Sequence, residues 1–283
     1  MTNLYFLNNM RPDTRKLPNK YRRTLSDREA SVLTDLSFNG KIIFSPHDLQ
    51  VYVDNPRSLV DGLIRKKWIL KLAKEVYLIV PFEAGKMGAA NYTIHSFVVA
   101  SVLVEPYYIG YWSAFNYHGF SDQTSPAIYL ATQKPRNSCR ILDTQFRFIT
   151  INPKKFFGID EVEIEGRKVK ISSPEKTLVD CLDHPEHCEG VQEVAKALYF
   201  GKGEIDFYKI VTLSKRIGNN AVIKRLGYIA EQLDLREIMQ HLSGVELSEG
   251  YSLLDPTLPR KGRIKEKWKI VANIEIDQGK WVS

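Results

Sequence analysis

Two cysteines and two histidines lie close together in the second half of the sequence. Cys181, His184, His187 and Cys188 form a C-x2-H-x2-H-C cluster, and thiolates and imidazoles are ligands that zinc prefers. A structural zinc site usually separates its two ligand pairs by a longer loop, which this cluster lacks. We therefore interpret the cluster as a chance grouping. The sequence also has no P-loop, G-x-G-x-x-G or H-E-x-x-H motif, so we expect neither a metal nor an organic cofactor.

The serine and carboxylate patterns of the second half predict structural roles before catalytic ones. Ser113 precedes His118 by five residues, but no G-x-S-x-G motif surrounds the serine. The run Ser173–Glu175 is typical of a helix start, with the serine as cap and a proline at the first helical position. Asp180 follows five residues after Glu175, a spacing that does not bring the two carboxylates together on one helix face. We expect capping here rather than acid–base catalysis.

One acidic pattern could serve an enzyme. Glu161, Glu163 and Glu165 alternate along an expected strand and share a face, with Asp160 beside them. Gathered around a metal ion, these carboxylates would suit a nuclease or transferase that a winged-helix module delivers to nucleic acid. An exposed strand edge carries the same residues. A nucleic-acid-processing enzyme is therefore the alternative function, and we favour a protein that is not an enzyme.

Residues 25–82 have the pattern of a winged helix-turn-helix. Two capping signals, Ser26 with Glu29 and Ser45 before a proline, begin a helix and a short helix. Asn55 caps a third helix that runs to about Lys67, and an expected β-hairpin follows. The third helix is predicted over residues 57–67, and the two hairpin strands over residues 68–72 and 76–80.

In a winged helix-turn-helix the third helix lies in the major groove and the hairpin lies along the DNA backbone. Arg57 and Ser58 would face base edges, and Asp61 would accept from cytosine N4 or orient a neighbouring arginine. Other basic residues would contact phosphates, and a basic arm would follow the backbone or enter the minor groove. Use of the module for protein docking alone is the alternative. The candidate DNA-binding residues are Arg57, Ser58, Asp61, Arg65, Lys66, Lys67, Lys71 and Lys74, with Arg15, Lys16, Arg22 and Arg23 in the arm.

The positive charge of the chain is concentrated at its two ends. Residues 1–82 contain fourteen Lys and Arg against eight Asp and Glu, a net charge of +6 out of the total of +7. Residues 260–283 contain seven against three, a net of +4, so residues 83–259 carry −3. Lys and Arg gain affinity for phosphates by releasing condensed counterions. The asymmetry therefore favours a polyanion-binding module at the N-terminus, although a solvated basic tail would produce it too.

Length and patterning predict two domains of α+β class. The 283 residues allow about two domains of ordinary size. The arm covers residues 1–24 and the winged helix residues 25–82. Two glycines in residues 83–90 indicate a linker from the winged helix to a second domain over 91–283. That domain is predicted as a larger mixed α+β domain with a mainly helical second half. A last strand over 268–276 is expected to return to its sheet.

Composition points to a cytoplasmic protein. The longest apolar stretch, residues 97–104, is far shorter than the roughly 20 residues that cross a bilayer. The first twenty residues lack the apolar region of a secretory signal. Three cysteines are too few for a disulfide framework, which favours a reducing compartment.

Three ordered motifs in the second domain carry a family resemblance. They are IGYWSAFNYHGF at 109–120, VKISSPEKTLVD at 169–180 and KRLGYIAE at 224–231. Together with the N-terminal winged helix, they resemble the AbiEi family of type IV toxin–antitoxin regulators. The family's paired glycines appear here as Glu189-Gly190, a departure in one loop. The motif residues of the antitoxin domain are Ser113, His118, Ser173, Pro174, Glu175, Asp180, Arg225, Gly227 and Tyr228.

This resemblance implies a function that the residues alone do not. It implies a transcriptional autorepressor that binds inverted repeats in its own promoter and an antitoxin that antagonises a nucleotidyltransferase-type toxin. The implied ligand is double-stranded DNA, bound by two copies because palindromic half-sites reflect paired modules. In this family the antitoxin generally acts without a stable complex with the toxin, so the toxin is a functional partner. We expect no catalytic residue.

Overall fold

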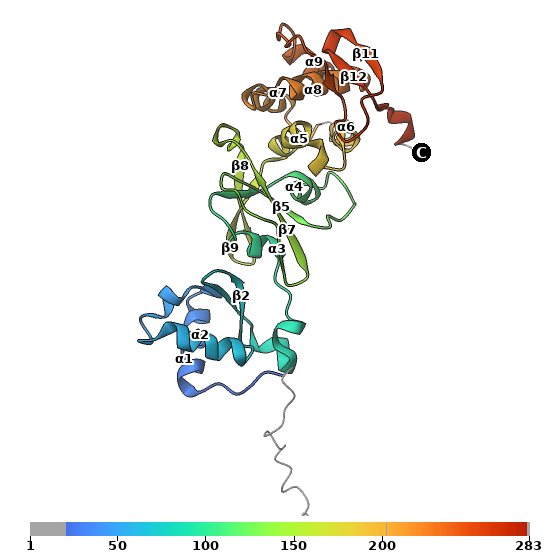
Figure 1. Ribbon diagram of the computed structural model, residues 1–283. Coiled ribbons are helices and arrows are strands. Elements are labelled where there is room, and N and C mark those ends of the chain that lie inside the picture. Colours follow the sequence, from blue (N-terminus) through green and yellow to red (C-terminus); the bar gives the residue numbers. More distant parts are fainter. Residues whose placement is uncertain (1–20, 202, 282–283) are drawn as a thin grey trace, which may run out of the picture. The chain divides into compact units, whose positions relative to one another are not determined.

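The computed structural model describes residues 21–201 and 203–281, and the chain divides into two compact units between Ile94 and His95 (Figure 1). Both units mix helices with strands, so the predicted α+β class is confirmed. Within the described residues, no helix is long and apolar enough to cross a membrane.

Helix caps organise the first unit as its sequence predicts. Ser26 accepts a hydrogen bond from the Glu29 amide, and the Glu29 carboxylate accepts one from the Ser26 amide, which completes a capping box. The Asn55 side chain accepts from the Ser58 amide in the same way. The helical elements are α1 (Asp27–Phe38), the short 3-10 helix η2 (Pro46–Leu49) and α2 (Pro56–Arg65).

A three-stranded antiparallel sheet closes this unit. The predicted hairpin forms from β2 (Ile69–Ala73) and β3 (Val76–Ile79), and β3 also pairs with β1 (Ile43–Phe44), a two-residue strand that the sequence did not reveal. Buried apolar side chains of α1, α2 and the sheet form one core. The segment expected as a linker is built of 3-10 turns, η3 (Phe82–Asn91).

A six-stranded mixed sheet forms the first half of the second unit. Its strand order is β6-β7-β5-β4-β9-β8, with parallel pairing of β5 with β7 and of β4 with β9. Two short helices accompany it, α3 (Ser96–Ala100) and α4 (Tyr111–Tyr117). The strands are β4 (Tyr107–Ile109), β5 (Ile128–Thr132), β6 (Cys139–Ile141), β7 (Thr144–Thr150), β8 (Ile159–Ile164) and β9 (Arg167–Ser172).

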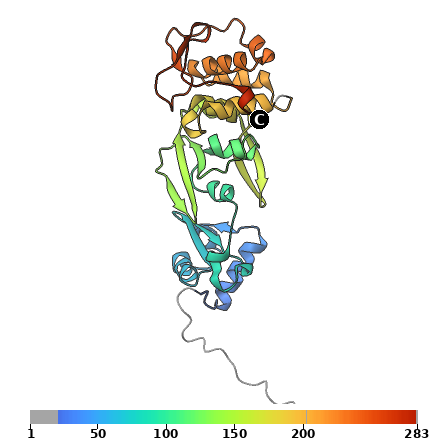
Figure 2. The same ribbon diagram turned by 90° about the vertical axis from the view of Figure 1, so that its right-hand side faces the viewer.

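Helices make up most of the second half of this unit, as predicted. Helices α5 and α6 lie between the sheet and helices α7, α8 and α9, as two perpendicular views show (Figures 1 and 2). Helix α5 packs against α4, α6, α7 and α8, so it joins the sheet end to the helical end. The helices are α5 (Pro174–Asp183), α6 (Val191–Phe200), α7 (Phe207–Arg216), α8 (Asn220–Gln232) and α9 (Arg236–His241).

The prediction for the last strand is wrong. Strand β12 (Ile270–Ala272) does not return to the six-stranded sheet but pairs with β10 (Ser252–Leu253) and β11 (Arg263–Lys265) in a separate sheet. Lys269 adopts left-handed backbone angles and interrupts the extended run. Trp268 therefore lies outside the strand and packs on α8, where its indole donates to Glu231 Oε2 at 2.8 Å.

Replacement of Gly227 by alanine should destabilise the second unit. A Cβ at this position of α8 would lie 2.1 Å from Cζ3 of Trp268, so the buried indole would have to move. We expect Gly227→Ala to lower the free energy of unfolding by about 1–3 kcal/mol, as overpacking does. Alanine is the better helix former by about 1 kcal/mol, so any loss reports the clash. Urea unfolding followed by circular dichroism measures it.

Gly250→Ala is the matched control, because a Cβ there has nothing within 4 Å. Equal stability of the two variants would show that Gly227 is not held by this close approach.

Candidate nucleic-acid interface and the buried motif residues

Helix α2 exposes a row of polar and charged side chains. Its apolar side chains Val60 and Leu63 are buried in the core of the first unit. Arg57, Asp61 and Arg65 recur every four residues on the opposite, exposed side. Ser58 is exposed as well, beside Arg57 at the start of the helix. These four side chains of α2 are therefore all exposed to solvent.

The hairpin adds further charge beside the start of α2. Arg57 forms an ion pair with Glu75 in the hairpin turn, with Nη2 and Oε1 3.4 Å apart and side chains 83% and 54% exposed. Lys71 and Lys74 of the same hairpin are exposed. An ion pair this exposed contributes little to stability, so a phosphate can replace Glu75 at small cost.

The Lys66 side chain, in contrast, belongs to the packing of the first unit. Lys66 Nζ lies 2.5 Å from Glu29 Oε2, and both side chains are largely shielded from solvent. Burial alone would raise the pKa of Glu29, but hydrogen bonds from Lys66 and Ser26 hold it below its ordinary value. Lys67 has left-handed backbone angles, and its carbonyl accepts from Arg22.

The basic arm is only partly described. Arg22 stacks its guanidinium on the Trp68 ring at 4.1 Å and donates to the carbonyls of Lys67 and Val80, so it is anchored to the unit. Arg23 is exposed next to it. The other two predicted arm residues, Arg15 and Lys16, lie outside the described residues.

The first family motif ties α4 to two strands. Ser113 is buried, donates to the Ala127 carbonyl and accepts from the Tyr129 amide at 2.9 Å. His118 Nε2 lies 2.8 Å from the Ser172 carbonyl, so this nitrogen carries the proton. Burial lowers the pKa of His118 and favours its neutral form. Both side chains engage the backbone and not each other, which leaves no nucleophile–base pair between them.

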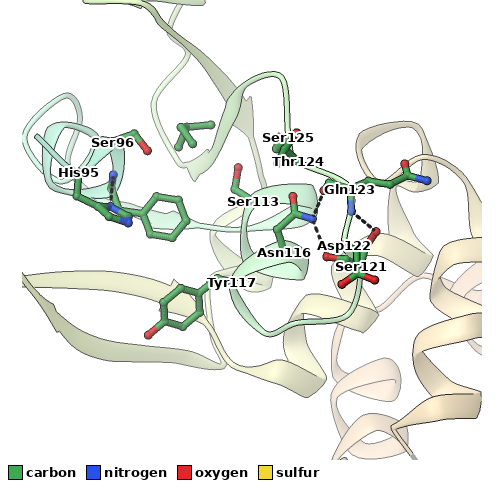
Figure 3. Close-up of a pocket in the computed structure, with 12 residues that line it drawn as sticks. His95, Ser96, Ser113, Asn116, Tyr117, Ser121, Asp122, Gln123, Thr124 and Ser125 are labelled. Atoms are coloured by element: carbon green, nitrogen blue, oxygen red, sulfur yellow. Dashed lines mark hydrogen bonds between the residues drawn. The ribbon is translucent and has the colours of Figure 1, made fainter. Parts of the chain in front are cut away.

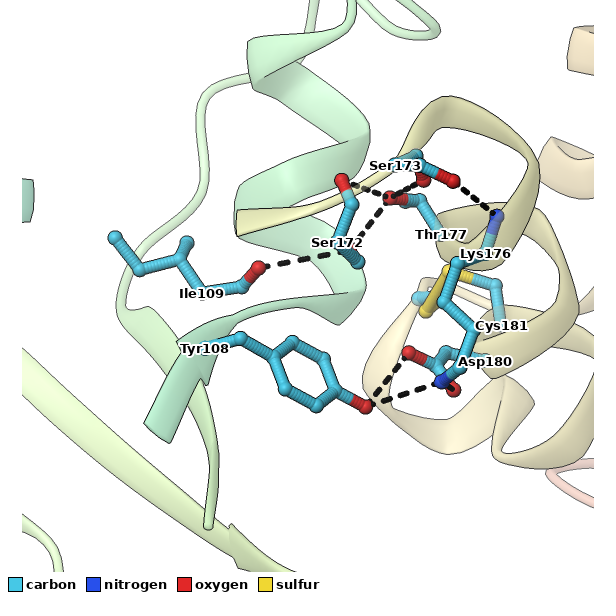
Figure 4. The surroundings of a disulfide bond; sticks show 9 residues. Tyr108, Ile109, Ser172, Ser173, Lys176, Thr177, Asp180 and Cys181 are labelled. Atoms are coloured by element: carbon cyan, nitrogen blue, oxygen red, sulfur yellow. Dashed lines mark hydrogen bonds and ion pairs between the residues drawn. A yellow bond between two sulfur atoms is a disulfide. The ribbon is translucent and has the colours of Figure 1, made fainter. Parts of the chain in front are cut away.

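The second motif forms the buried start of α5 (Figure 4). Ser173 caps the helix, whose first residue is Pro174, and Glu175 forms an ion pair with Lys209 of α7 at 2.7 Å. Lys176 and Asp180 form an ion pair in the interior, and the Tyr108 hydroxyl donates to Asp180 at 2.9 Å. Burial raises the pKa of Asp180, and Lys176 opposes that shift.

The third motif connects α8 to its surroundings. Arg225 donates to the Leu182 carbonyl at the end of α5 and to the Leu253 carbonyl of β10. Gly227 permits the contact with Trp268, and Tyr228 is buried in the core. The motif residues thus build the interior of the second unit, and the geometry supports the capping and packing roles over catalysis.

A pocket of about 520 Å³ lies beside the first motif (Figure 3). Ser113, Asn116 and Tyr117 of α4 line one side of it, and residues 95–97 and 121–125 complete the wall. The Asn116 amide donates to the carbonyls of Ser121 and Gln123, while its oxygen is buried without a partner among the described residues. The exposed lining is mainly apolar, with several hydroxyl groups and one carboxylate, that of Asp122.

The acidic strand does not form a metal centre. Glu161 on edge strand β8 pairs with Lys168 of β9 at 2.7 Å, and Glu163 lies opposite the same lysine. Glu165 lies in the turn after β8, and its carboxylate accepts a hydrogen bond from the His95 backbone amide. Over residues 21–201 and 203–281, only one group of three or more His, Cys, Asp or Glu side chains lies close enough together to hold a metal ion. It consists of His184, Glu186 and His187. The glutamates of β8 therefore decorate an exposed edge.

The cysteines of the C-x2-H-x2-H-C cluster bond to each other. Cys181 and Cys188 form a buried disulfide between α5 and the loop before α6, and Cys139 is the free cysteine (Figure 4). The cysteine count led us to expect reduced thiols, and this pair departs from that expectation. The signal that could have revealed it is the spacing of seven residues across a helix end, which brings the two Cα atoms to 5.5 Å.

Comparison with known proteins identifies a fold. No family model matches the chain, and no curated protein matches it. The structure is similar to the crystal structure of the RV2827C protein from Mycobacterium tuberculosis, with a TM-score of 0.64 and 13% sequence identity. The likeness covers 91% of this chain and 95% of that one. At this identity the similarity concerns the fold, which extends over both units.

Removal of the carboxylate at position 180 should be costly. Asp180→Ala leaves the fully buried Lys176 without its counter-charge, which typically lowers the free energy of unfolding by about 3–5 kcal/mol. The combined change Lys176→Met and Asp180→Leu removes both charges, so it should recover much of that loss. Chemical unfolding of the three proteins measures the difference. A near-neutral Asp180→Ala would mean that the ion pair is not a structural element of α5.

Proposed function

We propose that the protein is a DNA-binding transcriptional autorepressor and the antitoxin of a type IV toxin–antitoxin system, which neutralises a nucleotidyltransferase-type toxin without being an enzyme itself. The observation that carries the DNA-binding part is the exposed row Arg57, Asp61 and Arg65 on α2, beside the exposed hairpin lysines. The antitoxin part rests on the three AbiEi-like motifs.

The first unit serves as a winged helix-turn-helix in this proposal. Its order of α1, η2, α2 and the β2–β3 hairpin supports that assignment. Helix α2 enters the major groove, where the Arg57 fork matches guanine and Asp61 accepts from cytosine N4. Arg65, Lys71 and Lys74 contact phosphates on either side. The Lys66 and Arg22 side chains instead hold the module together, through Glu29 and Trp68.

Two copies bind one operator in this proposal. A helix-turn-helix module reads one half-site, and half-sites separated by about one helical turn, roughly 10 base pairs, present the same face to both copies. The inverted repeat in the promoter then mirrors the pairing of two identical modules.

The second unit contributes its surface to toxin neutralisation. Its motif residues are engaged in internal hydrogen bonds and ion pairs, so they maintain the fold that presents this surface. The glutamates that the enzymatic alternative was expected to use lie on the exposed edge strand β8, where Glu161 pairs with Lys168.

Loss of two arginines should weaken specific DNA binding. Gel-shift titration of the DNA upstream of the protein's own gene should show retardation by the wild type. Arg57→Ala with Arg65→Ala should weaken it by at least tenfold, since each good base or phosphate contact is worth about 1–3 kcal/mol. If Arg65 contacts a phosphate, its removal should also reduce the slope of log K against log salt by about one.

Arg236→Ala is the control for loss of an exposed, ion-paired arginine outside the first unit. Arg236 pairs with Asp234 at 3.3 Å with side chains 83% and 76% exposed, which closely resembles the Arg57–Glu75 pair in the other unit. The DNA claim is wrong if the wild type causes no shift, or if the double variant and this control bind alike.

Co-expression should separate neutralisation from repression. We expect the neighbouring gene to encode a nucleotidyltransferase. When that gene is expressed from a foreign promoter, the wild-type protein should relieve the growth arrest that it causes. The Arg57→Ala, Arg65→Ala variant should relieve the arrest equally, because promoter binding plays no part under these conditions. Persistent arrest with wild-type protein, or a neighbouring gene of another class, would count against the antitoxin assignment.

A further inference from the structure

The connection between α5 and α6 is a small loop closed at both ends. Cys181 near the end of α5 and Cys188 before α6 form a disulfide, and both are fully buried. Residues Pro185–His187 between them form one 3-10 turn. The disulfide fixes both ends of this turn, so the side chains on it are held in place.

Three potential metal ligands meet on this loop. One ligand atom from each of His184, Glu186 and His187 lies within 4.8 Å of the other two. His184 Nδ1 and Glu186 Oε1 are 2.9 Å apart. The His184 and Glu186 side chains are 36% and 46% exposed, so an ion can reach them from solvent.

The surroundings orient both imidazoles. Asp183 Oδ2 lies 3.4 Å from His184 Nε2, the ring nitrogen that faces away from Glu186. Asp183 is buried and is itself held by Lys155 Nζ at 2.6 Å and Asn219 Nδ2 at 2.7 Å. A carboxylate on the far nitrogen of a ligating histidine fixes the tautomer and raises its basicity, as in many zinc sites.

The second histidine is positioned by aromatic rings. His187 packs edge-on against Tyr111 of α4 with ring centres 5.3 Å apart, and its ring also lies 5.9 Å from that of Tyr129 of β5. The two histidine rings are stacked with centres 5.9 Å apart. The imidazoles therefore come from one loop but are oriented by three other elements.

We propose that His184, Glu186 and His187 bind a divalent transition-metal ion of the zinc class. Two imidazoles and one carboxylate form a donor set that zinc accepts, and water completes the coordination. The two sulfurs are bonded to each other and are not ligands, so the site differs from the C-x2-H-x2-H-C cluster of the sequence. The bound ion fixes the α5–α6 connection and carries a water that faces solvent.

Metal titration of the full-length, untagged, oxidised protein tests this site independently of DNA or toxin. After removal of metal with a chelator, calorimetry with Zn²⁺ should show one saturable site. Co²⁺ should show visible d–d bands without a thiolate-to-metal charge-transfer band. His187→Ala and Glu186→Gln should each weaken binding by more than about 100-fold, beyond the roughly 10–100-fold that loss of a surrounding partner typically causes.

His241→Ala is the control, since His241 sits 3.9 Å from Glu237 as an ordinary helical pair and should leave the affinity unchanged. Circular dichroism shows whether the variants are folded. If His187→Ala does not fold, Glu186→Gln still tests the site, because it changes an exposed side chain and keeps its shape. The proposal is overturned if no saturable binding occurs, if Glu186→Gln binds as tightly as wild type, or if binding appears only after reduction together with the sulfur charge-transfer band.

Discussion

The ion pair between Lys176 and Asp180 is the constraint on which the arrangement of the second unit depends. Two charges removed from water are tolerated only when they meet each other and their remaining hydrogen bonds are satisfied. The two residues lie one helical turn apart on α5, and Tyr108 of β4 supplies the additional hydrogen bond. The hydrogen bond from Tyr108 ties α5 to β4, and the same helix packs against α4, α6, α7 and α8.

Other polar motif residues of the second unit also make buried or partly buried hydrogen bonds. His118 holds the end of α4 to the end of β9, and Arg225 satisfies carbonyls at the end of α5 and on β10. Buried polar groups of this kind rigidify a fold when all of them have partners. The second unit thus hides its charged motif residues, while the first unit exposes its own on α2 and the hairpin. Residues that bind a partner are therefore expected on the surface of each unit. The buried motif residues give the surface of the second unit a fixed shape.

Local signals predicted most elements well. The caps at Ser26, Asn55 and Ser173 all form, because a side chain three residues from its amide partner needs no help from distant parts of the chain. Short elements escaped prediction: β1 has two residues and β6 three, too few for a periodic pattern. The strand at the C-terminus was recognised, but its partner was not, since pairing depends on residues far away in sequence.

The sequence by itself determined where the capped helices begin, which residues carry charge and which motifs occur in order. Tertiary structure decided which of those charges are available. Lys66 finds Glu29, 37 residues earlier, and Arg22 finds Trp68, so two expected contacts become packing residues while Arg57 and Arg65 remain exposed. The two cysteines of the cluster likewise form a disulfide with each other, and the two histidines lie close to Glu186. A side chain's partner is a property of position in space, and nearby sequence specifies that position only within about one turn of a helix or one strand pair.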